Sequence, residues 1–178
     1  RLKAAIGLMP PGRRPRLLDV GHGSGVLLRQ LQGHAEHLFG VDHHDYHVPV
    51  REYLAKHGVA VRLARGDAMA LPFESEAFDI VSCVSVLEHV PDVRLAVREL
   101  RRVLKPGGVL IAGFPPKNRL TAACFRIIGF DHDRFHPNTE RDILSALADL
   151  LTIDFVWSRP SRAPLFILAR CMRKSAPP

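Results

Sequence analysis

The sequence predicts an α/β fold with a seven-stranded, mostly parallel sheet, an antiparallel last strand and helices on both faces. From residue 16 onward, short apolar runs alternate with segments whose apolar residues recur at helical spacing, as in parallel strands joined by helices. Only seven residues separate the last two β-rich runs, 152–157 and 165–169, which is too few for a helical crossover. This last pair is therefore expected to be antiparallel.

The length of the chain suits one domain. It has 178 residues, of which 47% are hydrophobic, so one core can bury much of its surface. We expect a single domain over residues 1–178, with a short lead at 1–15 and a substrate-facing insertion or lid at 116–138. No apolar run approaches the ~20 residues of a membrane-spanning helix, and the three separated cysteines suggest reduced thiols in a cytoplasmic protein.

Five apolar runs are the candidate parallel strands, and four segments between or after them have helical apolar spacing. The expected strands are 16–21, 37–42, 60–67, 78–85 and 109–114. The expected helices are one beginning near Val26 with Gly33 at its end, one over 49–57, one from Asp92 to the Pro106-Gly107-Gly108 run, and one opened by a Thr139/Asp142 capping box.

The basic charge is concentrated at the two ends of the chain. Residues 1–16 and 155–178 each carry five Lys or Arg and no acid, so the remainder has 25 − 10 = 15 basic and 18 acidic residues, or −3. Solvated ends are the simplest interpretation, although such ends also help anionic partners to dock. We expect the basic residues that flank the first and last strands to lie away from the ligand edge of the sheet. These are Arg13, Arg14, Arg16, Arg170 and Arg173.

Three loops follow the first three strands, at the edge where open α/β sheets bind ligands. The first is a glycine-rich turn at 19–25, whose backbone can approach a ligand closely before a helix begins. Asp42 ends the second strand 21 positions after Gly21, where a carboxylate can accept from ribose hydroxyls. Asp67 ends the third strand and can read a base edge. Together they indicate an adenosine-containing ligand.

Six motifs in order resemble the class I S-adenosylmethionine-dependent methyltransferases, in particular the type that includes quinone-biosynthesis enzymes. The resemblance runs from about Leu17 to Leu168. It rests on residues 18–25, 40–42, 66–73, 78–81, 86–90 and 99–108. It implies a Rossmann-like fold, S-adenosyl-L-methionine as cofactor, and in-line methyl transfer to a small-molecule or lipophilic acceptor.

The resemblance also implies site residues. Three glycines would line the methionine part, one acid would lie near its amino group, and one serine would lie beside the sulfonium. Another acid would hold the ribose, and a third acid with a neighbouring backbone amide would bind adenine. In that order these are Gly21, Gly23, Gly25; Asp19; Ser85; Asp42; and Asp67 with Ala68 or Met69.

Two other functions remain open at this point. A NAD-dependent dehydrogenase is the first, but its usual turn is Gly-x-Gly-x-x-Gly, whereas this loop is Gly-x-Gly-x-Gly followed by Val26. A non-catalytic protein that binds an adenosine ligand is the second, since no residue proves turnover.

The catalytic residues and the acceptor are less well defined. His132 and His136 are weak candidates for a general base, and we assign no metal site, because the histidines after Asp42 resemble a solvated loop. Nucleic acid is disfavoured as a substrate, because the loop after the fourth strand lacks the Asn/Asp-Pro-Pro-aromatic motif. Within residues 117–136, an apolar stripe at helical spacing predicts a lid for an apolar acceptor or a peripheral membrane contact. The oligomeric state stays undetermined.

Overall fold

The computed structural model describes residues 1–118, 121, 137–160 and 164–174. Its seven strands form a single sheet in the order β3-β2-β1-β4-β5-β7-β6. Pairs from β3 to β5 are parallel, and β7 is antiparallel to both β5 and β6. The predicted fold is therefore confirmed. The strands are β1 (Arg14–Val20), β2 (Ala35–Asp42), β3 (Val61–Arg65), β4 (Phe78–Val84), β5 (Leu104–Phe114), β6 (Thr152–Arg159) and β7 (Phe166–Met172).

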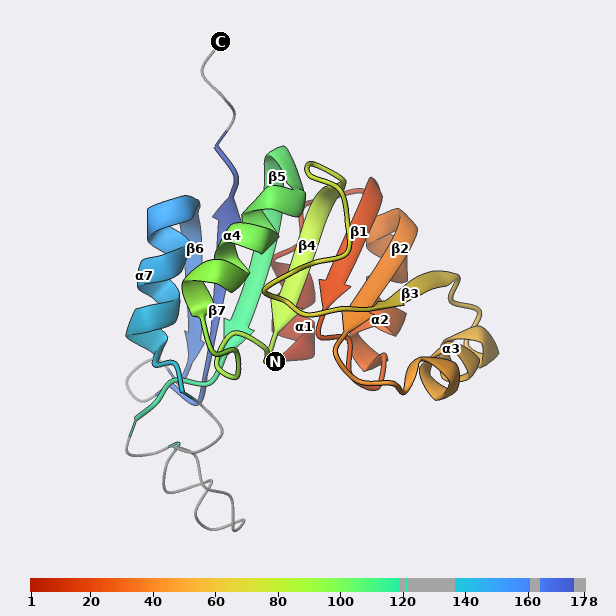
Figure 1. Cartoon of the computed structure of the whole chain (residues 1–178), viewed down its shortest axis with the longest axis horizontal. Coiled ribbons are helices and arrows are strands. Elements are labelled where there is room, and N and C mark those ends of the chain that lie inside the picture. Colours follow the sequence, from red (N-terminus) through yellow and green to blue (C-terminus); the bar gives the residue numbers. More distant parts are fainter. Residues whose placement is uncertain (119–120, 122–136, 161–163, 175–178) are drawn as a thin grey trace.

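Helices cover both faces of this sheet (Figure 1). On the near face, α4 (Val93–Val103) and α7 (Glu140–Leu150) pack against one apolar cluster. On the other face, α1 (Leu2–Gly7), α2 (Val26–Leu31) and α3 (His47–Lys56) contribute to a second cluster. A short 3₁₀ turn, η1 (Gln32–His34), joins α2 to β2.

Two helix starts agree with their sequence signals. Asp92 caps α4, because its Oδ1 accepts a hydrogen bond from the Leu95 N–H at 2.9 Å. Thr139 and Asp142 form a reciprocal capping box at the start of α7. These bonds satisfy amide groups that have no partner inside the helix.

Two local expectations were wrong. The helix α4 ends at Val103, not at the Pro106-Gly107-Gly108 run, because buried Leu104 turns extended and pairs with Phe78 as the start of β5. Gly33 lies inside η1 and is not the end of a helix with a left-handed cap. The expected lead at 1–15 is not contradicted, and within it the structure adds α1, which buries Ala5 and is followed by buried Met9.

The basic residues near the strand ends are bonded at the edge where the parallel strands begin. Arg13 donates to the Ala35 carbonyl, and Arg173 donates to the Leu104 carbonyl. Arg170 pairs with Asp154 on the neighbouring strand, with Nη2 and Oδ2 2.7 Å apart. Arg1 differs, because its guanidinium lies over the ring of Phe166, the first residue of β7. Arg13, Arg170 and Arg173 thus lie away from the ligand edge of the sheet, as predicted. Arg1 does not.

No helix in the described part of the chain is long and apolar enough to cross a membrane. Cys83 and Cys171 are buried and unpaired. Most of the expected lid at 116–138, including His132 and His136, lies outside the described residues. The lid and these two base candidates therefore stay predictions. The prediction that the chain is a single domain also stays untested.

Candidate cofactor site

A cavity of about 600 Å³ lies at the carboxyl ends of β1 to β4. Its centre is the junction of β1 and β4, where the strand order reverses and open α/β sheets bind their ligands. The volume is within the range of pockets for small molecules and cofactors. Its lining residues come from four consecutive loops: Val20, Gly21, Gly23; Val41, Asp42, His43, His44; Gly66, Asp67, Ala68, Met69; Ser85, Val86, His89, Val90 and Pro91.

The glycine-rich turn forms one wall of the cavity. Gly21 has a φ of +75°, and a Cβ at this position would collide with the Val86 side chain. Its N–H donates to the Val41 carbonyl at 2.8 Å, which fixes the turn against β2. Glycine is therefore required here both by the backbone conformation and by the close approach of Val86.

Gly25 lies behind this wall, at the start of α2, and does not line the cavity. Its φ is +79°, and an added Cβ would lie 2.9 Å from a Val50 methyl group on α3. This glycine permits the packing of α2 on α3. Its contact with the methionine part of a cofactor stays a prediction.

Asp42 is the carboxylate held most firmly in the cavity wall. Its Oδ2 accepts from the Gly23 N–H at 2.8 Å and its Oδ1 accepts from the His44 N–H at 3.4 Å. Burial alone would raise the pKa of Asp42, but the Gly23 N–H and the nearby His44 outweigh it, so the pKa is below its ordinary value. An ionised, oriented carboxylate therefore faces the cavity, as a ribose site requires.

Asp67 and its neighbours form a tight turn at the end of β3. The Asp67 Oδ1 accepts from the Met69 N–H at 2.8 Å, and the Ala70 N–H donates to the Asp67 carbonyl at 3.0 Å. Because the Met69 amide is engaged in this turn, the Ala68 amide is the better candidate for a ring nitrogen. The contact of Asp67 with the adenine amino group stays a prediction.

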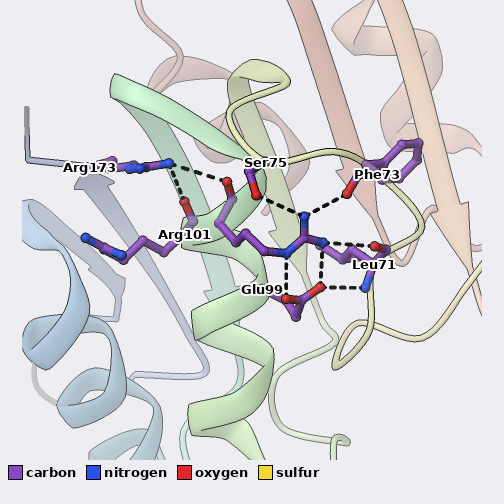
Figure 2. Close-up of polar contacts among 7 residues, drawn as sticks. Leu71, Phe73, Ser75, Glu99, Arg101 and Arg173 are labelled. Carbon is purple, nitrogen blue, oxygen red and sulfur yellow. Dashed lines mark hydrogen bonds and ion pairs between the residues drawn. The ribbon is translucent and has the colours of Figure 1, made fainter.

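A charged pair on α4 fixes the loop that follows Asp67 (Figure 2). The Arg102 guanidinium donates to the Leu71 carbonyl at 3.0 Å and to the Phe73 carbonyl at 2.7 Å. It also pairs with Glu99, whose Oε2 accepts from the Leu71 N–H at 2.9 Å. The planar guanidinium and the carboxylate thus hold both backbone groups of Leu71. The sequence pattern did not predict this support, although both residues lie in the motif at 99–108.

Asp19 is buried within the sheet and is not among the cavity-lining residues. Its Oδ1 accepts from the Ser82 hydroxyl, while its Oδ2 has no hydrogen-bond partner within the described residues. Burial raises the pKa of Asp19 to about 7, and the Asp42 charge adds to this effect, against the opposing Ser82 bond. A positively charged group at its open oxygen would favour the ionised form. Its predicted proximity to the cofactor's amino group remains a prediction.

The turn after β4 forms a second wall of the cavity, next to the glycine-rich turn. Ser85 has a φ of +61°, uncommon for a residue with a side chain, and its N–H donates to the Gly113 carbonyl at 2.7 Å. Val86, His89, Val90 and Pro91 follow it around the cavity. Within this segment the resemblance predicted a site role for Ser85 alone, although residues 86–90 belong to one of its motifs.

His22 is buried and has a defined contact, which its position in the sequence did not indicate. It is only 4% exposed, and its Nδ1 lies 3.0 Å from the Gly23 carbonyl. Burial lowers the pKa of His22 below its ordinary value, against the opposing effects of Gly23 and Asp42, so the ring is neutral near pH 7. His43 and His44, expected in a solvated loop, are cavity-lining residues.

Comparison with known proteins identifies the family of the chain. Residues 18–112 match the family described as methyltransferase domain, more than half of the chain. The chain belongs to this family of S-adenosylmethionine-dependent methyltransferases. The family assignment from the sequence motifs is therefore confirmed. The cofactor of this family is S-adenosylmethionine, as predicted.

Relatives in sequence match a little more than half of the chain. A demethylmenaquinone methyltransferase of Staphylococcus saprophyticus is 37% identical over 99 residues, which are 54% of this chain and 42% of that enzyme. The uncharacterized methyltransferase YcgJ of Bacillus subtilis is 37% identical over 107 residues, 58% of this chain and 42% of that protein. The match thus spans less than half of each relative.

Similar solved structures cover nearly the whole chain. The crystal structure of YcgJ superposes with a TM-score of 0.77 at 20% identity and covers 98% of each chain. The N-methyltransferase NodS from Bradyrhizobium japonicum, in complex with S-adenosyl-l-homocysteine, gives a TM-score of 0.76 at 20% identity, with 97% of this chain and 85% of NodS covered. At this identity the likeness establishes the shared fold.

Proposed function

We propose that this methyltransferase domain binds S-adenosylmethionine in the cavity at the ends of β1 to β4 and transfers its methyl group to a small-molecule acceptor. The observation that carries the proposal is the placement of Asp42 and Asp67 on neighbouring strand ends around one cavity, beside the close-packed turn at Gly21. Asp42 would accept from the ribose hydroxyls, and Asp67 with the Ala68 amide would bind the adenine edge.

Methyl transfer requires little acid–base catalysis by the protein. The sulfonium already carries a good leaving group, so alignment of the acceptor in line with the methyl–sulfur bond is the main task. Orientation of this kind can supply roughly 7–11 kcal/mol of a barrier. Ser85 and Val86, at the end of β4, would position the reacting end of the cofactor, and apolar neighbours such as Val90 and Pro91 would exclude water.

The binding part of the proposal is tested by calorimetric titration with S-adenosylhomocysteine. Asp42→Ala and Asp67→Ala should each weaken binding by about 1–3 kcal/mol, because each leaves ligand donors unpaired. Asp45→Ala is the matched control, because Asp45 is exposed, pairs with Arg65 and does not line the cavity. Unchanged affinity in both cavity variants would overturn this placement of the site. Tighter binding of NAD than of S-adenosylhomocysteine would favour a dehydrogenase.

We further infer that the acceptor is a lipophilic small molecule, such as a quinol-like ring. The matched relative's name, demethylmenaquinone methyltransferase, supports this class, and the valines and proline of the second wall supply an apolar approach. A cytoplasmic protein would bind an acceptor of this type at a membrane surface. Free buried thiols at Cys83 and Cys171 suit that compartment.

Transfer of a labelled methyl group tests the acceptor class. The protein is incubated with methyl-labelled S-adenosylmethionine and separate lipid, aqueous-metabolite and RNA fractions of a cell extract. Label in an organic-soluble product of the lipid fraction is the expected result. Label in RNA alone would contradict a small-molecule acceptor. Cofactor binding without transfer to any fraction would favour the non-catalytic alternative.

A further inference from the structure

Three imidazole rings gather beside Asp42, next to the proposed cofactor cavity. His22 comes from the turn after β1, His44 from the loop after β2, and His47 is the first residue of α3. Their ring centroids are 5.2 Å (His22 to His44), 5.6 Å (His22 to His47) and 5.8 Å (His44 to His47) apart. Parallel pairing of β1 with β2 brings the two loops together.

His22 is arranged as a metal-binding histidine is. The Gly23 carbonyl can only accept, so the His22 Nδ1, 3.0 Å away, carries the proton. The lone pair therefore resides on Nε2, which is buried and has no hydrogen-bond partner within the part of the chain that is described. Ligating histidines characteristically donate their other N–H to a carbonyl or carboxylate. This ring has both features, and methyl transfer uses neither.

His47 presents a second unexplained group. Both of its ring nitrogens are buried and lack a hydrogen-bond partner among the described residues. A buried polar atom without a partner is costly and points to a missing bond. Two orphaned imidazoles side by side share one explanation, which is a common ligand that accepts their lone pairs.

Asp42 and His44 complete the donor set. One ligand atom from each of His22, Asp42 and His44 can be chosen so that all three lie within 4.8 Å of one another. Small side-chain rotations would bring them to the ~2.0–2.2 Å bonds that Zn²⁺ makes to nitrogen and carboxylate oxygen. Coordination through the His44 Nε2 would free the Tyr46 N–H from its bond to Nδ1, and this exposed residue can turn that N–H to water.

We propose that His22, His44 and Asp42, with His47 as a fourth ligand that reaches them by a side-chain rotation, form a binding site for a divalent transition-metal ion, for which Zn²⁺ is the best match. Imidazole with one carboxylate is a donor set that suits Zn²⁺ and is poor for Mg²⁺ or Ca²⁺, which prefer oxygen. The site goes beyond methyl transfer. Because Asp42 is also the proposed ribose partner, an ion bound here opposes binding of the nucleoside and makes the domain sensitive to metal.

Metal binding is measured on the chelator-treated chain, without nucleoside, by competition for Zn²⁺ with a colorimetric chelator and by the visible spectrum of added Co²⁺. One equivalent should bind the wild type, with the intense Co²⁺ bands of a four-coordinate site. His22→Gln and His47→Ala should each lower the Zn²⁺ affinity at least ~10-fold. His37→Ala is the matched control, because His37 is an exposed histidine on β2, outside the cluster.

The same variants separate this proposal from the cofactor proposal. His47 does not line the cavity, so His47→Ala should bind S-adenosylhomocysteine like the wild type in metal-free buffer while losing Zn²⁺. Saturating Zn²⁺ should raise the apparent Kd of the wild type for S-adenosylhomocysteine about tenfold or more. Wild-type-like Zn²⁺ binding by both His22→Gln and His47→Ala, with melting temperatures intact, would overturn the site. An unchanged nucleoside affinity in Zn²⁺ would overturn the shared use of Asp42.

Discussion

Two buried carboxyl groups lie in and next to the sheet, Asp19 on β1 and Glu88 in the turn after β4. Asp19 and Glu88 are both buried, and each keeps one carboxylate oxygen without a hydrogen-bond partner in the described chain. Burial raises the pKa of each to about 7. In the absence of a ligand, these carboxyls therefore hold protons at a pH where they would be ionised in water.

This difference predicts a pH-dependent stability. Between about pH 4 and 7 the folded chain binds more protons at Asp19 than the unfolded chain does, so the Asp19 contribution to the free energy of unfolding falls as pH rises through this window. Asp19→Asn removes the titration. Its stability relative to the wild type should rise from pH 5 to 7, by up to about 1.4 kcal/mol per pH unit. Urea denaturation at several pH values measures this, and a constant difference between the two proteins would contradict it.

The cavity wall provides a second residue-scale test, because Gly21 and Gly23 differ in their surroundings. Both have a positive φ, but an added Cβ collides with Val86 at Gly21 and meets nothing within 4 Å at Gly23. Gly21→Ala should therefore destabilise the chain by about 1–3 kcal/mol more than Gly23→Ala, since the extra cost is overpacking. Urea denaturation of the two variants measures the difference. Equal losses would mean that Val86 moves aside freely.

At the scale of elements, the helix α4 supports a separate part of the chain, the loop that follows Asp67. Arg102 and Glu99 hold the backbone of Leu71 and Phe73, which follow the predicted adenine-binding turn at Asp67 (Figure 2). The turn keeps its shape through an ion pair on a neighbouring helix, so this part of the site depends on the docking of α4.

Arg102→Lys tests this support. Lysine keeps the charge but not the planar fork, so at least one carbonyl bond should be lost. We expect a loss of about 1–2 kcal/mol in unfolding free energy, together with faster amide hydrogen exchange in residues 66–73 and weaker S-adenosylhomocysteine binding. Arg98→Lys is the control, because Arg98 is exposed on the same helix. Unchanged exchange in the loop would show that Glu99 alone holds it.

At the scale of the whole molecule, the C-terminal strand β7 lies between β5 and β6 in the sheet, and one arginine holds its end. Arg173 donates to the carbonyls of Arg101 and Leu104, where α4 passes into β5, and pairs with Glu76 at 2.6 Å. Its side chain is 14% exposed. Arg170, on the same strand, makes only a more exposed pair with Asp154 among the described residues.

The two arginines should therefore differ in their contribution to stability. Arg173→Ala leaves partly buried carbonyls without a donor and should cost about 1–3 kcal/mol. Arg170→Ala removes a surface ion pair and should cost ~1 kcal/mol or less. Urea midpoints of the two variants give the comparison, and S-adenosylhomocysteine affinity should stay unchanged in both, since neither residue lines the cavity. A larger loss at Arg170 would contradict the assigned role of Arg173.

The sequence by itself determined the order and type of the main elements. Alternation of apolar runs with helical spacing, and a connection too short for a crossover, were enough to predict the sheet with its antiparallel last strand. The same local signals placed Asp42 and Asp67 at strand ends and the glycine turn before α2. These features are readable because they depend on residues close together in the chain.

Tertiary structure alone decided which of those residues share a surface. It separated Gly25 and Asp19 from the cavity lining and brought His43 and His44 into it. It also brought His22, from one loop, against the histidines of another. Such contacts depend on the pairing of β1 with β2 and on the tilt of α3, which local spacing does not encode. Burial then sets the charge of each group, because the cost of ionisation depends on everything packed around it.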